Sequence, residues 1–145
     1  MRHIQSKSPD NTSKAFVWLI VFFFSPLLLA MEDSAVPDKL LKRPFVKSVF
    51  DQLQASGQPV LVDVYASWCP TCERQQWVLQ DYFKKYPDSK LTVMVVDFDN
   101  DKQWVSFFKA PRQSSLLLFD SGERVWFSLA ETRKRIIFDA LSSVE

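Results

Sequence analysis

The sequence predicts an α/β fold with a central mixed β-sheet that is flanked by helices. Two apolar runs, residues 60–66 and 91–98, are typical of strands that are buried on both faces of a parallel sheet. The stretch between them has apolar side chains at helical spacing, which indicates a crossover helix. Two later apolar runs flank the turn sequence at residues 120–123, a pattern typical of an antiparallel hairpin. One sheet with both parallel and antiparallel strands is therefore expected.

The individual elements follow from apolar spacing and from the residues that begin or end helices. Gly57 ends the first helix, and Pro70 is tolerated in the first turn of the crossover helix. Asn100 or Asp101 is expected to cap a short third helix. In chain order we expect a helix at 45–55, a strand at 60–66, a helix at 70–86, a strand at 91–98, a helix at 101–108, strands at 116–119 and 125–129, and a helix at 132–144.

The length and charge of the chain restrict its domain organisation and its partners. The 145 residues suit one domain, expected at residues 45–145, and a short N-terminal appendage. There are 18 Lys and Arg residues against 17 Asp and Glu residues, and no basic stripe is present, so no nucleic-acid partner is expected. The chain has only two glycines, which leaves few positions for a loop that cradles phosphate. We therefore expect no nucleotide and no other bound cofactor.

The N-terminus resembles an export signal. Residues 1–14 are polar and basic, and residues 15–30 form an uncharged apolar run that ends in a small residue, Ala30. We expect residues 1–31 to be either a cleaved signal peptide or an uncleaved membrane anchor, with the tether at residues 15–31. Residues 32–44 are expected to be a polar linker. Both alternatives export the rest of the chain to the periplasm or another extracytoplasmic space.

The only two cysteines, Cys69 and Cys72, form a C-x-x-C motif between the strand at 60–66 and the crossover helix. The N-terminus of a helix favours a thiolate, which is the nucleophile in thiol–disulfide exchange, and a second sulfur two residues later can resolve the mixed disulfide. A structural disulfide is disfavoured because so short a loop removes little chain entropy. Zinc would need about four ligands, whereas the only histidine is His3, and residue 73 is Glu where haem attachment needs histidine. No metal site is expected.

The sequence Trp68-Cys69-Pro70-Thr71-Cys72 after such a strand, together with the hairpin at residues 116–123, resembles the thioredoxin superfamily over residues 40–145. The resemblance implies a thioredoxin-like fold and thiol–disulfide oxidoreductase activity on disulfides of partner proteins. It assigns the nucleophile to Cys69 and the resolving thiol to Cys72.

Asp63 precedes Cys69 by six residues, where thioredoxins have a buried acid. Burial among apolar neighbours would raise the pKa of this carboxyl, which could then accept a proton from Cys72. The alternative is a solvated aspartate at a strand edge. Thioredoxins often pair this acid with a lysine on the next strand, and the matching residue here is Val95.

Four residues near the expected dithiol are candidates for substrate binding. Ser114 occupies the position at which the superfamily has a cis-proline, and we expect a trans peptide bond there because cis costs ~3 kcal/mol before serine. Its hydroxyl could stabilise the Cys69 thiolate, or the residue could merely shape a loop. Trp68 is expected to shield Cys69, and Arg112 and Gln113 to contact substrate.

These features predict an exported disulfide reductase that receives electrons from a membrane protein. The reducing direction is favoured because Thr71 provides no cation next to Cys69. Three alternatives stay open: an oxidant, a protein-binding module whose dithiol is idle or regulatory, and, ranked last, metal binding by Cys69 and Cys72 across a dimer.

Overall fold

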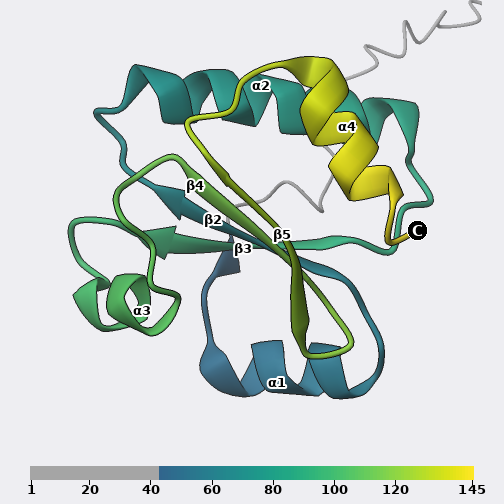
Figure 1. Cartoon of the computed structure of the whole chain (residues 1–145), viewed down its shortest axis with the longest axis horizontal. Coiled ribbons are helices and arrows are strands. Elements are labelled where there is room, and N and C mark those ends of the chain that lie inside the picture. The colour runs from purple at the N-terminus through teal and green to yellow at the C-terminus, as the bar shows by residue number, and fades with distance from the viewer. Residues whose placement is uncertain (1–42) are drawn as a thin grey trace, which may run out of the picture. The chain divides into compact units, whose positions relative to one another are not determined.

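The computed structural model describes residues 43–145, which contain one five-stranded mixed sheet (Figure 1). The strand order is β1-β3-β2-β4-β5. Strand β3 pairs in parallel with β1 and β2, and β4 pairs antiparallel with β2 and β5. The mixed sheet expected from the sequence is confirmed. The strands are β1 (Arg43–Pro44), β2 (Val60–Tyr65), β3 (Thr92–Asp97), β4 (Ser115–Asp120) and β5 (Glu123–Leu129).

Helices cover both faces of this sheet. Figure 1 shows α2 (Pro70–Lys85) and α4 (Lys134–Ser142) on one face, with α1 (Lys47–Ala55) and α3 (Lys102–Phe107) on the other. Each predicted helix is present, with ends that differ by at most two residues from those expected.

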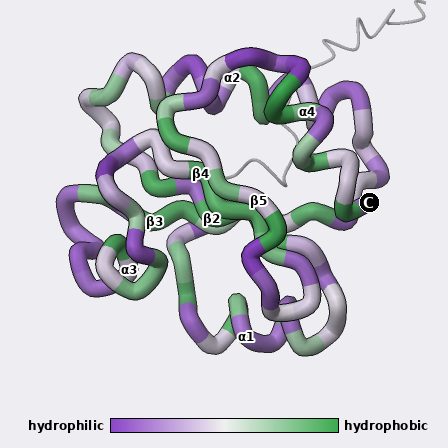
Figure 2. Tube along the Cα trace, in the orientation of Figure 1, coloured by the Kyte–Doolittle hydropathy of each residue, from purple (hydrophilic) through white to green (hydrophobic). Residues whose placement is uncertain are grey.

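Two apolar cores result, one on each face, because successive side chains of a strand point to opposite sides. On β2, Leu61 packs into the core beneath α2 and α4, whereas Val62 packs into the core beneath α1 and α3. Figure 2 shows the apolar central strands between more polar surface segments. Asp63 shares the strand face of Leu61 and therefore points towards α2.

The first strand is the element that the sequence did not reveal. Arg43 and Pro44 pair with β3, and the Phe45 backbone N–H continues this ladder by donating to the Val95 carbonyl at 2.8 Å. Because Phe45 still belongs to the ladder, α1 begins at Lys47. The last two residues of the expected linker thus lie in the sheet, whereas the signal, the anchor and the rest of the linker lie outside the described residues.

The hairpin between β4 and β5 turns through two residues with left-handed backbone, Ser121 at φ 50° and Gly122 at φ 89°. Two successive positive φ angles are typical of the type I′ turn, which matches the twist of paired strands. The antiparallel hairpin expected at residues 120–123 is therefore confirmed.

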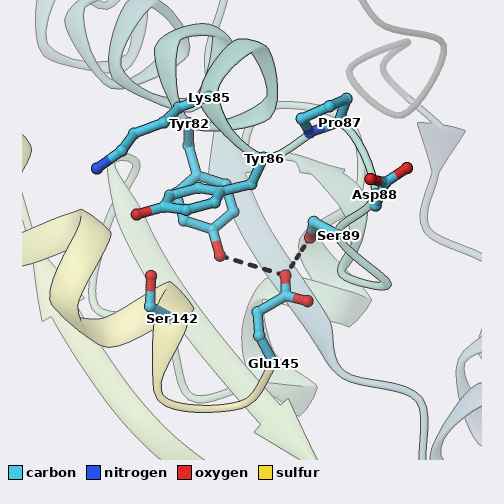
Figure 3. A pocket seen from close by; sticks show the side chains of 8 residues that line it. All are labelled: Tyr82, Lys85, Tyr86, Pro87, Asp88, Ser89, Ser142 and Glu145. Carbon is cyan, nitrogen blue, oxygen red and sulfur yellow. Dashed lines mark hydrogen bonds between the residues drawn. The ribbon is translucent and has the colours of Figure 1, made fainter.

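The last residue ties α4 to the end of α2 (Figure 3). The hydroxyls of Tyr82 and Ser89 donate to the Glu145 carboxylate, which lies in a cavity also lined by Lys85, Tyr86 and Ser142. Tyr82 is fully buried and packs edge-on against Phe138 of α4. Between residues 43 and 145, no helix combines the length and apolarity needed to cross a membrane.

Candidate active site

The site begins where β2 ends and α2 starts. Cys69 is the N-cap of α2, with extended backbone at φ −94° and ψ 110°, and its Sγ accepts a hydrogen bond from the Cys72 backbone N–H at 3.3 Å. Pro70 is tolerated in the first turn because its missing N–H would have no partner in the helix. The Cys69 sulfur thus accepts a hydrogen bond from a backbone N–H of the first helical turn that has no partner within the helix, as an N-capping side chain does.

The two thiols have different environments. Cys69 is 6% exposed and Cys72 is fully buried, and both are free thiols in the structure. Burial opposes ionisation of Cys69, but hydrogen bonds from Ser114, Cys72 and the Thr71 backbone outweigh it and lower the pKa of Cys69 below its ordinary value. Burial, together with the neighbouring Cys69, raises the pKa of Cys72. Cys69 is therefore the thiol that ionises first.

Ser114 lies directly against both sulfurs. Its Oγ is 3.2 Å from Cys69 Sγ and 3.1 Å from Cys72 Sγ, within hydrogen-bond range of each. No peptide bond among residues 43–145 is cis, so the bond before Ser114 is trans, as expected. The residue instead has left-handed backbone at φ 62°, and its N–H donates to the Val64 carbonyl at 2.8 Å.

A buried glutamine holds the Ser114 backbone in place. Gln75 of α2 is fully buried, and its Nε2 donates to the carbonyls of Ser114 at 3.2 Å and Glu131 at 3.0 Å. The Ser114 carbonyl also accepts from the Ala130 N–H at 2.9 Å. Gln75 was not predicted from the sequence, although an amide side chain one helical turn after Cys72, on the buried side of α2, was an available signal.

Asp63 is fully buried, so the alternative of a solvated strand edge is wrong. Its Oδ2 accepts a hydrogen bond from Gln76 Nε2 at 2.5 Å, and Val95 is its register partner on β3. An amide of α2 thus contacts the acid of this chain, and the facing β3 position is apolar. Gln76 is a second residue that sequence reasoning missed.

The remaining candidates, Trp68, Arg112 and Gln113, belong to the segments that lead into Cys69 and Ser114. Trp68 is 59% exposed, and its indole N–H donates to Asp99 Oδ2 at 2.7 Å, so its side chain extends towards the loop after β3. Arg112 is exposed, and its carbonyl accepts from Ser115 Oγ at 2.7 Å; Gln113 is half-buried. Arg112 and Gln113 therefore belong to the loop that delivers Ser114.

The donor set of the site offers two sulfurs and one hydroxyl. Among residues 43–145, the structure brings together no group of three or more His, Cys, Asp or Glu side chains that could hold a metal ion. A dithiol with one more acidic and one less acidic thiol is instead suited to thiol–disulfide exchange.

The thioredoxin family model matches residues 42–142. The chain belongs to the thioredoxin family. A thioredoxin of Alicyclobacillus acidocaldarius is 33% identical over 76 residues, covering 52% of this chain and 71% of that protein. The bifunctional thioredoxin reductase/thioredoxin of Mycobacterium leprae is 29% identical over 67% of this chain, which spans only 21% of that longer protein.

Among solved structures, Trxlp from Edwardsiella tarda has 41% sequence identity and a TM-score of 0.64, covering 68% of this chain and 96% of that one. The thioredoxin-like fold expected from the Trp-Cys-Pro-Thr-Cys motif is therefore confirmed. Family membership implies thiol–disulfide oxidoreductase activity in general, and Cys69 and Cys72 lie close enough to form the redox dithiol.

Proposed function

We propose that this chain is an exported thiol–disulfide oxidoreductase that reduces disulfides in client proteins and is itself re-reduced by a membrane protein. The observation that carries the proposal is the asymmetry of the dithiol. Cys69 caps α2 with a lowered pKa, and Cys72 is buried behind it with a raised pKa. Cys69 then attacks a client disulfide, and Cys72 resolves the mixed disulfide.

The reducing direction is supported by what surrounds Cys69. The groups that lower its pKa are a hydroxyl, the second thiol and two backbone N–H groups, none of which is a cation. A strong oxidant owes its potential to a stabilised reduced form, and a neighbouring cation is an effective way to stabilise a thiolate. The equilibrium reduction potential of the full chain tests the direction: a value near about −270 mV supports a reductant, and one near about −120 mV overturns it.

Client trapping tests the enzymatic activity. A Cys72→Ala variant should accumulate mixed disulfides through Cys69, because the thiol that resolves them is missing. The matched control, Cys69→Ser, should trap none. If Cys72→Ala also traps none, the exchange activity is refuted.

The second candidate is a protein-binding module whose dithiol is idle or regulatory. It is favoured by Ser114, which has a trans peptide bond and left-handed backbone where the superfamily has a cis-proline. Such a module would retain its clients after reduction and in the Cys69→Ser variant. An exchange enzyme would lose them under both conditions.

Export is proposed from residues 1–31 alone. Cell fractionation with mass spectrometry of the N-terminus separates the two alternatives: a soluble extracytoplasmic form that lacks the apolar run, or an intact chain in the membrane fraction. An intact chain in the cytosol would refute both.

A further inference from the structure

We propose that Ser114 is a catalytic residue that stabilises two thiolates in succession, first that of Cys69 and then that of Cys72. The inference rests on the proposed exchange activity and adds a step to it. The supporting observation is that Ser114 Oγ lies within hydrogen-bond distance of both sulfurs, 3.2 Å from Cys69 Sγ and 3.1 Å from Cys72 Sγ.

A hydroxyl has one hydrogen to donate and two lone pairs that accept. Ser114 therefore cannot donate to both sulfurs at once. In the reduced protein, its hydrogen goes to the Cys69 thiolate, while the protonated Cys72 thiol donates to the Ser114 oxygen. The Cys72 thiol thus donates to the Ser114 oxygen, and the Ser114 hydroxyl in turn donates to the Cys69 sulfur.

Attack on a client disulfide changes this order. The Cys69 thiolate forms a bond to one client sulfur, the client S–S bond breaks, and the other client sulfur leaves with the electron pair and takes a proton from water. The Cys69 sulfur is now uncharged and is a poor hydrogen-bond acceptor. The Ser114 hydroxyl is released from it and turns its hydrogen to Cys72, a rotation about one bond.

The second step then uses the same hydroxyl. Cys72 loses its proton to Asp63, the acceptor expected from the sequence, which returns it to solvent, and the Cys72 thiolate, held by Ser114, attacks Cys69 Sγ. The Cys69–Cys72 bond forms, the bond from Cys69 to the client breaks, and the second client sulfur leaves with the electron pair and is protonated by water. The client disulfide is reduced to two thiols, and the dithiol of this chain is oxidised to a disulfide.

The surroundings of Ser114 suit this role. Ser114 is only 3% exposed, so little water can replace the hydroxyl at the sulfurs. Its backbone is fixed by Val64 on one side, and by Gln75 and Ala130 on the other. The hydroxyl therefore needs to move only its hydrogen, and its oxygen keeps the same position in both steps.

Other charged and titratable groups lie on the elements that pack around the pair. On α2, the Arg74 guanidinium donates to the Thr71 hydroxyl, and in the loop after β3, Asp99 binds the exposed Trp68. The other such groups are Asp63 and Tyr65 on β2, Arg112 in the loop before Ser114, and Glu131, whose backbone carbonyl binds Gln75. All of them stay unchanged in the variants below.

The test follows both steps in one experiment. The reduced full chain is mixed with 5,5′-dithiobis(2-nitrobenzoate), which releases one coloured thiolate when Cys69 attacks and a second when Cys72 resolves. Because the chain contains only two cysteines, the two phases can be assigned without ambiguity. Each phase is measured as a function of pH.

The Ser114→Ala variant should move the pH profiles of both phases to higher pH by about one unit. At a fixed pH below the midpoint of a profile, the rate of that phase should fall about tenfold. Ser114→Gly also removes the hydroxyl and is compatible with the left-handed backbone of this residue. It should shift both profiles by the same amount as Ser114→Ala, and it replaces that variant in the test if Ser114→Ala does not fold. The control Ser115→Ala removes the neighbouring hydroxyl at the start of β4, which donates to the Arg112 carbonyl, and should shift neither profile.

The outcomes separate this inference from the proposed function. A shift of the first phase alone would refute the second role of Ser114, and unshifted profiles in both phases would refute both roles, while the exchange activity stands in either case. If the unmodified chain showed no second phase, the exchange activity itself would be refuted.

Discussion

Ser114 is the residue with the largest expected effect on the redox properties of the dithiol. Its hydroxyl binds both sulfurs of the reduced protein, whereas oxidation removes the thiolate that it stabilises. The hydroxyl therefore favours the reduced form and raises the reduction potential.

In a Ser114→Ala variant the reduction potential should become more negative by about 30 mV, because a hydrogen bond that shifts the thiolate pKa by about one unit contributes about 1.4 kcal/mol. Equilibration in thiol buffers, followed by alkylation and mass spectrometry, measures the reduced fraction. Ser115→Ala should leave the potential unchanged. A reduction potential that stays the same or rises in Ser114→Ala would contradict the interpretation that the Ser114 hydroxyl stabilises the reduced dithiol.

The residues of the site were only partly predictable from the sequence. Cys69, Cys72 and Ser114 could be found because their positions are fixed by the motif and by the order of strands along the chain. Gln75 and Gln76 could not, because their partners, Ser114 and Asp63, are 39 and 13 residues away and depend on how α2 packs on the sheet. A polar residue on a helix carries no local sign of such a partner.

At the scale of elements, the β4–β5 hairpin depends on one glycine. Gly122 has φ 89°, a left-handed conformation that costs a residue with a Cβ about 1–2 kcal/mol. Apart from Gly122 and its two chain neighbours, no heavy atom lies within 4 Å of the position that a Cβ would occupy, so the cost of a side chain there is conformational.

A Gly122→Ala variant should therefore lose about 1 kcal/mol of stability, a fall in Tm of about 4–8 °C for a domain of this size. Thermal unfolding followed by circular dichroism measures it. Gly122→Asn should lose less, because asparagine tolerates left-handed backbone. Equal losses in the two variants would show that something other than backbone conformation is responsible.

The sequence revealed the long elements and missed the shortest one. Apolar runs such as Val60–Tyr65 and the turn at Ser121 and Gly122 carry local signals that agree with their final structure. The strand Arg43–Pro44 consists of two residues, both exposed, and it is a strand only because it pairs with β3. Pairing of this kind is a tertiary effect, so no local pattern indicates it.

The domain as a whole should lose stability in strong alkali through one buried tyrosine. Burial raises the pKa of Tyr82 to about 12, and the neighbouring Glu145 carboxylate adds to the shift (Figure 3). A tyrosine in the unfolded chain ionises near about pH 10. The contribution of Tyr82 is thus fully present below pH 10 and is lost as the pH rises through about 12.

Urea unfolding between about pH 9 and pH 12 should show a decline in the free energy of unfolding that is shallower in Tyr82→Phe than in the unmodified chain. The control is Tyr86→Phe, because Lys85 lowers the pKa of Tyr86 and its loss should not flatten the decline. Identical slopes for Tyr82→Phe and the unmodified chain would contradict the assignment.

The unequal exposure of the two cysteines also bears on chemical damage. Peroxides convert an accessible thiolate to sulfenic acid, and further oxidation of that group becomes irreversible. Cys69 is the sulfur that such an oxidant meets first, and Cys72, sheltered directly behind it, can condense with the sulfenic acid to give a disulfide. An oxidant and a client disulfide thus lead to the same product, which a reductant can reverse, so the buried second thiol also protects the first from permanent loss.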